Sequence, residues 1–139
     1  MISNPRNGWS TFKLGDFFGT PSYLTNVPVD LLEEFIHYWK ESRTLSVYFD
    51  EEGSTFTLVA NPDSIYIIEE KEEPKLININ RNIKSLTFEL INDIEKDIDK
   101  WASEFVIAEE DVTENKDNIL SLLSELKTIL KEKKIKAEL

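Results

Sequence analysis

The stretch LSVYFDEEGSTFTLVANPDSIYIIEEKEEPKLININ, residues 45–80, decides the fold. Leu45, Val47 and Phe49 alternate with more polar neighbours, which is the period of a strand with one buried face. The same alternation returns over Phe56–Ala60, after the turn-forming residues Asp50–Gly53. These two runs predict an antiparallel β-hairpin.

Two further strand-like runs follow the hairpin. Ser64–Glu69 comes after an Asn-Pro-Asp turn, and Leu76–Asn80 comes after a charged loop that ends at Pro74. Because each connection is short, consecutive strands are expected to pair with one another. Residues 45–80 therefore predict an antiparallel meander of four strands.

The segments on either side of the meander have different periods. Trp9–Phe18 alternates weakly and predicts one more strand, whereas apolar residues at spacings of three and four predict a helix over Pro28–Glu41. The helical period returns over Ser85–Phe105 and again after Asp111–Glu114, a sequence that fits a capping box, in a helix running toward Lys136.

One apolar stripe is especially regular. On a continuous helix the following residues share one face and are expected to lie in the core: Leu90, Ile94, Ile98, Trp101 and Phe105. The predicted fold class is α+β, with an antiparallel meander sheet of about four to five strands, one N-terminal helix and two C-terminal helices. The chain 1–139 is interpreted as a single domain.

Composition narrows the function classes. The chain has 16 basic and 27 acidic side chains and a net charge of −11, which disfavours binding to nucleic acid or to anionic lipid. It has no cysteine, and Met1–Gly8 lacks the pattern of a secretory signal. No apolar run approaches the roughly 20 residues that cross a bilayer. A cytoplasmic protein without a membrane partner is expected.

Few residues suggest catalysis. His37 is the sole histidine, and no glycine-rich phosphate loop or calcium-loop motif is present. No metal, cofactor or catalytic residue is therefore predicted. General acid–base chemistry by two of the 27 carboxylates stays open as an alternative, although nothing in the sequence marks a particular pair.

The acidic residues are concentrated in two segments. Residues 50–73 hold eight acidic residues and one basic residue, and residues 85–111 hold nine and two, so each segment has a net charge of −7. We expect both segments to contribute to one electronegative surface that attracts a basic protein. The predicted partner-binding residues are Asp50, Glu51, Glu52, Glu69, Glu70, Glu72 and Glu73.

Several of these features together resemble small immunity proteins of bacterial polymorphic-toxin systems. The resemblance rests on Phe17–Leu24, the helix start at Val27-Pro28, the strand pair Leu45–Phe49 and Phe56–Ala60, and Asp97–Trp101. It implies a cytosolic binding protein that neutralises a cognate toxin, possibly a nuclease, by stoichiometric steric and electrostatic blockade. It assigns no toxin-binding residue.

Two alternatives remain beside that interpretation. One is a structural or regulatory interaction module without a toxin partner, and the other is a carboxylate-dependent enzyme. The sequence leaves open the identity of the partner, the oligomeric state and the role of the C-terminal helix.

Overall fold

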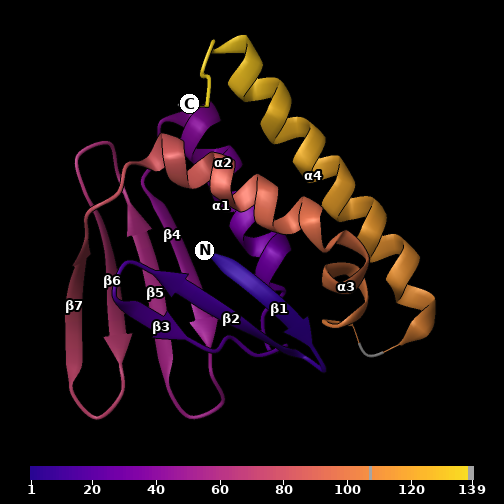
Figure 1. Ribbon diagram of the computed structural model, residues 1–139, viewed down its shortest axis with the longest axis horizontal. Coiled ribbons are helices and arrows are strands. Elements are labelled where there is room, and N and C mark those ends of the chain that lie inside the picture. Colours follow the sequence, from indigo (N-terminus) through magenta and orange to yellow (C-terminus); the bar gives the residue numbers. More distant parts are fainter. Residues whose placement is uncertain (107, 138–139) are drawn as a thin grey trace.

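The computed structural model describes residues 1–106 and 108–137 of the chain. Two antiparallel sheets and four α-helices enclose one continuous hydrophobic core in this part of the chain, which confirms the α+β class (Figure 1). The elements are β1 (Ile2–Arg6), β2 (Trp9–Leu14), β3 (Phe17–Gly19), α1 (Val27–Glu41), β4 (Leu45–Asp50), β5 (Thr55–Ala60), β6 (Ile65–Glu70), β7 (Pro74–Ile79), α2 (Ile83–Lys96), α3 (Ile98–Ser103), the 3₁₀ turn η1 (Glu109–Asp111) and α4 (Val112–Glu132).

The predicted meander is confirmed as a four-stranded sheet in the order β4-β5-β6-β7. Its register places Leu45 opposite Ala60, Val47 opposite Leu58 and Phe49 opposite Phe56. All six of these side chains are buried, as are Ile65 and Ile67 on β6. One face of the sheet is therefore the core face, and the alternation in the sequence identifies it.

The N-terminal prediction of a single strand over Trp9–Phe18 is wrong. Gly15, with φ +58°, lies in a two-residue turn that divides this segment into β2 and β3. A further strand, β1, pairs with β2 in a separate three-stranded sheet. The sequence of β1 lacks the regular alternation of a strand, because the register shifts between Ser3 and Arg6 and Asn4 has a left-handed conformation with φ +53°.

Aromatic side chains join the two sheets. The rings of Phe12 and Phe56 have centroids 5.0 Å apart, and those of Phe17 and Phe56 are 4.8 Å apart. Gly19 lies directly against this cluster, since a Cβ there would stand 2.6 Å from Phe56 Cε1. The glycine thus permits β3 to approach the four-stranded sheet closely.

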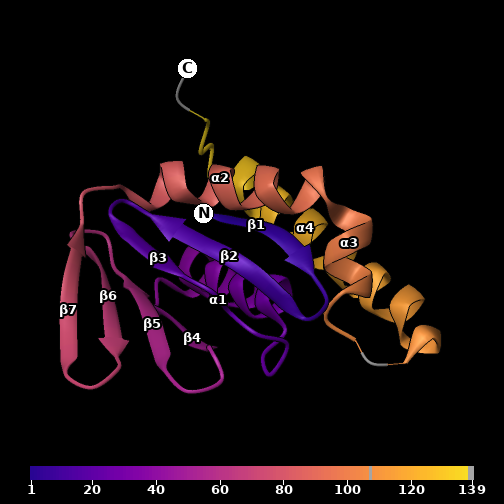
Figure 2. The same ribbon diagram turned by 60° about the horizontal axis from the view of Figure 1, so that its bottom comes forward.

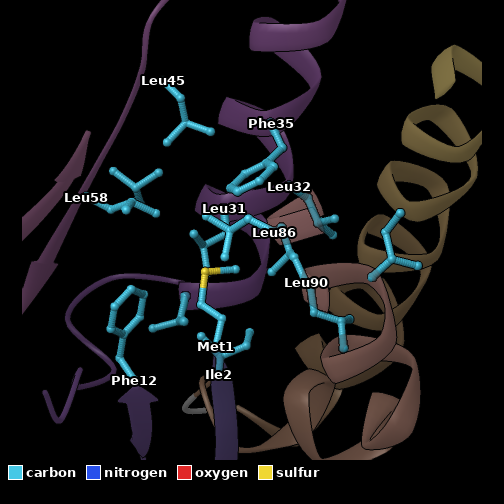
Figure 3. Close-up of a cluster of buried hydrophobic side chains, with 14 of the residues drawn as sticks. Met1, Ile2, Phe12, Leu31, Leu32, Phe35, Leu45, Leu58, Leu86 and Leu90 are labelled. Atoms are coloured by element: carbon cyan, nitrogen blue, oxygen red, sulfur yellow. The ribbon is translucent and has the colours of Figure 1, made fainter. Parts of the chain in front are cut away.

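The predicted first helix is confirmed as α1. Pro28 occupies its first turn, where a missing N–H costs nothing. Leu31, Leu32 and Phe35 on its inner side are fully buried and face Leu45 and Leu58 of the sheet (Figure 3). The side chain of Asn26, the residue before α1, makes no cap hydrogen bond, and its amide nitrogen donates to Asn115 Oδ1 at 3.0 Å.

The predicted continuous helix over Ser85–Phe105 is broken at Asp97, which has φ −131° and ψ 38°. Leu90, Ile94, Trp101 and Phe105 are nevertheless buried as predicted, whereas Ile98 is only half-buried. The break separates α2 from α3, so the buried residues of the apolar stripe are divided between these two helices and the residue Phe105 that follows them.

The C-terminal helix α4 begins close to the predicted position but without the expected capping box. Asp111 makes no side-chain cap hydrogen bond, because η1 leads into the helix and gives Asp111 a helical conformation. The helix also ends at Glu132 rather than near Lys136. Buried Asn115 connects α4 to α3 by donating to the carbonyl of Ala102 at 2.8 Å.

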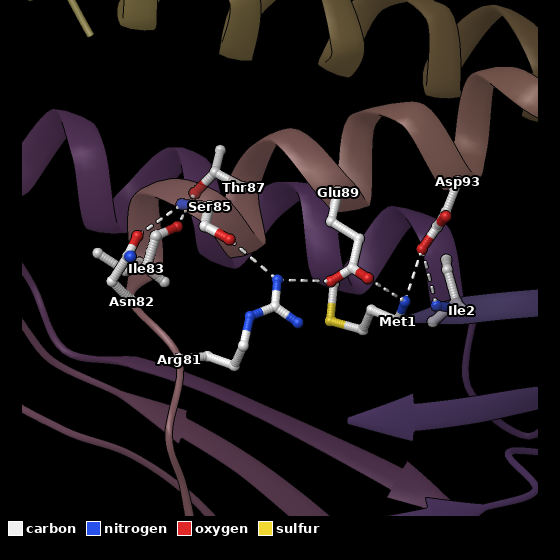
Figure 4. A network of polar contacts seen from close by, with 9 residues as sticks. All are labelled: Met1, Ile2, Arg81, Asn82, Ile83, Ser85, Thr87, Glu89 and Asp93. Atoms are coloured by element: carbon white, nitrogen blue, oxygen red, sulfur yellow. Dashed lines mark hydrogen bonds and ion pairs between the residues drawn. The ribbon is translucent and has the colours of Figure 1, made fainter. Parts of the chain in front are cut away.

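The N-terminal residue is tied to α2. The ammonium group of Met1 donates to Asp93 Oδ2 at 2.8 Å and lies 3.3 Å from Glu89 Oε1, while Arg81 pairs with Glu89 at 3.0 Å (Figure 4). These contacts fix β1 along α2, as Figure 2 shows. They also give two carboxylates of the acidic 85–111 segment a structural role.

Asp30 in the first turn of α1 provides a test of stability against pH. Burial and then the charges of Glu33 and Glu34 raise the pKa of its carboxyl from 3.8 to about 6. Because the folded state binds this proton more tightly than the unfolded state, ionised Asp30 destabilises the fold above that pKa. The cost at neutral pH is about 1 kcal/mol once solvent screening of this half-exposed group is included.

Asp30→Asn is therefore expected to raise the free energy of unfolding by about 1 kcal/mol at pH 7. Below pH 3.8 the two proteins should be equally stable, because Asp30 is then protonated in both states. Urea denaturation at the two pH values measures both differences. An equal gain at both values would mean that the aspartate does not titrate as described.

Candidate functional site

The two acidic turns of the meander lie at the same end of the four-stranded sheet. Asp50 pairs with Thr55, Thr55 with Glu70, and Glu70 with Pro74, so these residues form the last row of the sheet. The β4–β5 and β6–β7 turns extend beyond this row, at the bottom of Figure 1. We call the seven carboxylates predicted from the sequence (Asp50, Glu51, Glu52, Glu69, Glu70, Glu72 and Glu73) the acidic end.

The expectation of a single electronegative surface is wrong. Strand β7 starts at the acidic end and runs away from it, so α2 begins beyond the opposite end of the sheet. Figures 1 and 2 both place α2 and α3 far from the β6–β7 turn. An even number of antiparallel strands necessarily returns the chain to the end where it entered. The acids of residues 85–111 therefore lie apart from the acidic end.

Three of the seven predicted carboxylates are used by the fold itself. Glu51 accepts hydrogen bonds from the backbone N–H of Thr20 at 2.9 Å and from the hydroxyl of Ser54 at 3.0 Å. Asp50 Oδ1 accepts the N–H of Glu52 at 2.7 Å within the turn. Glu69 points to the core side of the sheet, is only 15% exposed, and pairs with Lys71 at 3.7 Å.

The remaining four carboxylates are exposed. Glu52 lies in the β4–β5 turn, Glu70 ends β6, and Glu72 and Glu73 lie in the β6–β7 turn. Glu70 accepts a hydrogen bond from the Thr55 hydroxyl at 3.2 Å, across neighbouring strands. These four side chains are the part of the acidic end that a partner can contact.

The opposite side of the sheet from the core forms an exposed surface, which we call the outer face. The register aligns Tyr48, Thr57, Ile68 and Leu76 in one row across all four strands. Tyr48 is 50% exposed and Leu76 is 60% exposed, while Thr57 and Ile68 are half-buried. This apolar row lies next to the row that contains Asp50 and Glu70, on the same face.

Tyr48 links the apolar row to the acidic end. Its hydroxyl donates to Asp50 Oδ2 at 3.5 Å. Partial desolvation, the neighbouring Asp50 carboxylate and the charge of Glu70 raise the pKa of Tyr48 above its usual value. The tyrosine therefore presents a neutral hydroxyl and an exposed ring edge in a field of negative charge.

The alternation of Tyr48 with Val47 and Phe49 in the sequence predicts part of this surface, because it places the tyrosine on the face opposite the core. Leu76 is not predicted to belong to it, because an isolated leucine in a predicted strand is ordinarily core. The pattern that identifies Leu76 as an outer-face residue is the alternation of Ile77 and Ile79 with Leu76 and Asn78, which the register of β7 confirms.

A second exposed set of aromatic residues lies on the three-stranded sheet and the segment after it. It comprises Trp9, Phe18 and Tyr23, which the sequence places near turns. Arg6 is paired with Trp9, and Lys13 with Phe18, while Glu104 lines a pocket together with Tyr23, so the charges around this set are mixed. The set lacks the concentration of carboxylates found at the acidic end.

His37 belongs to a polar cluster on the surface of α1. Its Nδ1 lies 3.1 Å from Glu34 Oε2 and also contacts the guanidinium of Arg43. Glu34 also accepts the N–H of Ser46 at 3.2 Å and binds Arg43 at 3.2 Å, so the cluster joins the end of α1 to β4. The histidine side chain is 40% exposed on the helix surface.

Comparison of the chain with protein-family models, with curated proteins and with solved structures finds no significant match. The resemblance to immunity proteins therefore stays a prediction. In residues 1–106 and 108–137, no helix combines the length and apolar character that a bilayer span requires. The same residues contain no group of three potential metal-ligating side chains arranged around a common point.

Glu51 is expected to stabilise the fold rather than to bind a partner. Glu51→Ala removes both acceptors for Thr20 and Ser54 and should lower the free energy of unfolding by about 1 kcal/mol. Glu52→Ala in the same turn should change it by less than about 0.5 kcal/mol, because Glu52 is exposed. Chemical denaturation of the two variants makes the comparison, and equal effects would refute the structural role of Glu51.

Proposed function

We propose that this protein is a binding protein for a basic protein partner, which it contacts with the outer face and the acidic end. The observation that supports this proposal is the adjacency of the exposed apolar row to Glu70 on the same face of the sheet, with Glu52, Glu72 and Glu73 exposed in the turns just beyond it. Interfaces commonly combine such apolar or aromatic anchors with charged groups around them. Neither feature alone would define a contact surface.

The two parts of the surface have different roles in the proposed complex. The exposed carboxylates attract a basic partner over a distance and raise the rate of encounter. Tyr48 and Leu76 then lose solvent-exposed area in the complex, which slows dissociation. A partner held in this way has its own basic surface covered.

A cognate toxin is the partner class that fits this mechanism and the resemblance to immunity proteins. Nucleases need basic surfaces to hold phosphate groups, so an acidic protein on that surface excludes the nucleic acid. Neutralisation would then be stoichiometric and would need no catalytic turnover by this chain. A regulatory partner of similar charge is the alternative.

Affinity capture from the native host tests the proposal. The tagged protein is compared with a variant that carries Glu52→Lys, Glu70→Lys, Glu72→Lys and Glu73→Lys. A matched control reverses four exposed carboxylates elsewhere, namely Glu41, Glu110, Asp117 and Glu132. The wild type and the control should retain one specific basic protein, and the acidic-end variant should lose it.

Capture that survives the acidic-end substitutions, or that is lost equally in both variants, contradicts the proposed surface. The toxin proposal is tested separately by expressing the captured partner in a bacterial host. Growth arrest that is relieved by co-expression of this chain supports neutralisation. A partner without toxicity favours the regulatory alternative instead.

A further inference from the structure

A groove lies between α2 and the C-terminal end of α4. Figure 1 shows the backbone of both helices. The volume of the groove is about 640 Å³. Phe88 of α2, Leu130 of α4 and Ile135 supply its apolar lining. Four lysines surround that lining, namely Lys127, Lys131, Lys134 and Lys136.

The groove is built by a well-defined helix end. The N–H of Ile135 donates to the carbonyl of Leu130 at 2.9 Å, and that of Lys134 donates to the carbonyl of Lys131 at 3.1 Å. Lys134 has the left-handed φ of +57°. These are the two hydrogen bonds of a Schellman motif, which brings the side chains of Ile135 and Leu130 together. The apolar lining is therefore held in place by backbone hydrogen bonds.

The charge around the groove is opposite to that of the molecule as a whole. Lys127 pairs with Glu95 of α2 at 2.6 Å. Among residues 1–106 and 108–137, no carboxylate forms an ion pair with Lys131, Lys134 or Lys136. In a chain with a net charge of −11, these three ammonium groups form a local positive site beside exposed apolar carbon.

We propose that this groove binds a free alkyl carboxylate, with its alkyl chain along Phe88, Leu130 and Ile135 and its carboxylate among the lysines. Pockets for small molecules commonly have this volume and combine an apolar lining with a few charged groups. A groove with apolar walls contacts an alkyl chain on more sides than a flat surface does. The net charge of −11 opposes approach to an anionic membrane, whereas a single small anion responds mainly to the nearby lysines.

Isothermal titration calorimetry with hexanoate, octanoate, decanoate and octanol tests this proposal on the full chain. Affinity should rise about tenfold for every two methylene groups, because each extends the buried apolar contact. Octanol should bind about tenfold more weakly than octanoate, because it cannot form a charge-assisted contact with lysine.

Variants identify the lysines that take part. Lys131→Glu with Lys136→Glu leaves Lys134 and its helix cap unchanged, and should weaken decanoate binding at least about tenfold. Lys13→Glu with Lys100→Glu makes the same charge change on other surfaces and should leave binding within about twofold. Circular dichroism confirms that each variant is folded.

Absence of decanoate binding at millimolar concentration would overturn the proposal. So would affinity that is independent of chain length, octanol binding as tight as octanoate binding, or equal effects of the two lysine pairs. Sedimentation with phosphatidylglycerol vesicles tests whether the groove contacts a membrane instead. Retention on vesicles without binding of monomeric decanoate would replace the proposed ligand site with a membrane-contact surface.

Discussion

Trp101→Ala is expected to lower the free energy of unfolding by about 3–5 kcal/mol, the range for truncating a large buried aromatic side chain. The indole is fully buried and stacks on Phe105 with ring centroids 5.7 Å apart. Its Nε1 donates to the carbonyl of Asp93 at 3.2 Å, across the break between α2 and α3. The substitution therefore removes apolar contacts and the hydrogen bond that fixes the angle between these helices.

Chemical denaturation measures the loss, and Trp9→Ala provides the control. Trp9 is 38% exposed on the three-stranded sheet, so its truncation should cost clearly less. A loss below about 1 kcal/mol for Trp101→Ala would place this residue at the surface. It would also contradict the packing of α3 against the core.

The second large effect concerns association with the partner. Reversing Glu52, Glu70, Glu72 and Glu73 to lysine should slow association by about tenfold to a hundredfold at low salt. The substituted side chains are exposed, so the free energy of unfolding should change little. Stopped-flow measurements with the captured partner give the association rate constant.

Salt provides an independent check on this rate effect. Association of the wild type should slow as salt rises, since the screening length shortens to about 8 Å at 0.15 M. The variant with Glu41, Glu110, Asp117 and Glu132 reversed has the same net charge as the acidic-end variant. Equal association rates for these two variants would mean that total charge, rather than the acidic end, governs the encounter.

The sequence predicts those elements of the fold whose pattern lies within one short segment of the chain. The pairing of β4 with β5 follows from alternation and a short turn, and both lie within one segment of the chain. Strand β1 could not be predicted in the same way, because Asn4 and Pro5 interrupt its pattern. Its place is fixed by contacts with β2 and with Asp93 on α2, 92 residues from Met1 in the chain.

The helix break at Asp97 has a similar explanation. The apolar period continues through Ile94, Ile98 and Trp101 without a glycine or proline, so the sequence predicts one helix. In the folded chain the Trp101 indole donates to the carbonyl of Asp93, which requires α3 to change direction. Tertiary packing thus overrides the local helical preference.

The sequence predicts which acidic residues belong to the candidate site, but it does not predict how their side chains are arranged. Counting charges locates the acidic end, because its carboxylates are close in sequence within two turns. Separating the roles of Glu51 and Glu52 requires the position of Thr20, which approaches the turn from 31 residues away. Recognising Leu76 as a surface residue requires the register of β7, since burial is a property of the folded sheet.

Hydrogen–deuterium exchange of the chain, alone and with the captured partner, tests the proposed contact surface most directly. The account predicts that the partner increases protection in β4, in β6 and β7, and in the two turns at the acidic end, while α4 and the three-stranded sheet are unchanged. Protection confined to α4, or to the surface around Trp9 and Phe18, would contradict it.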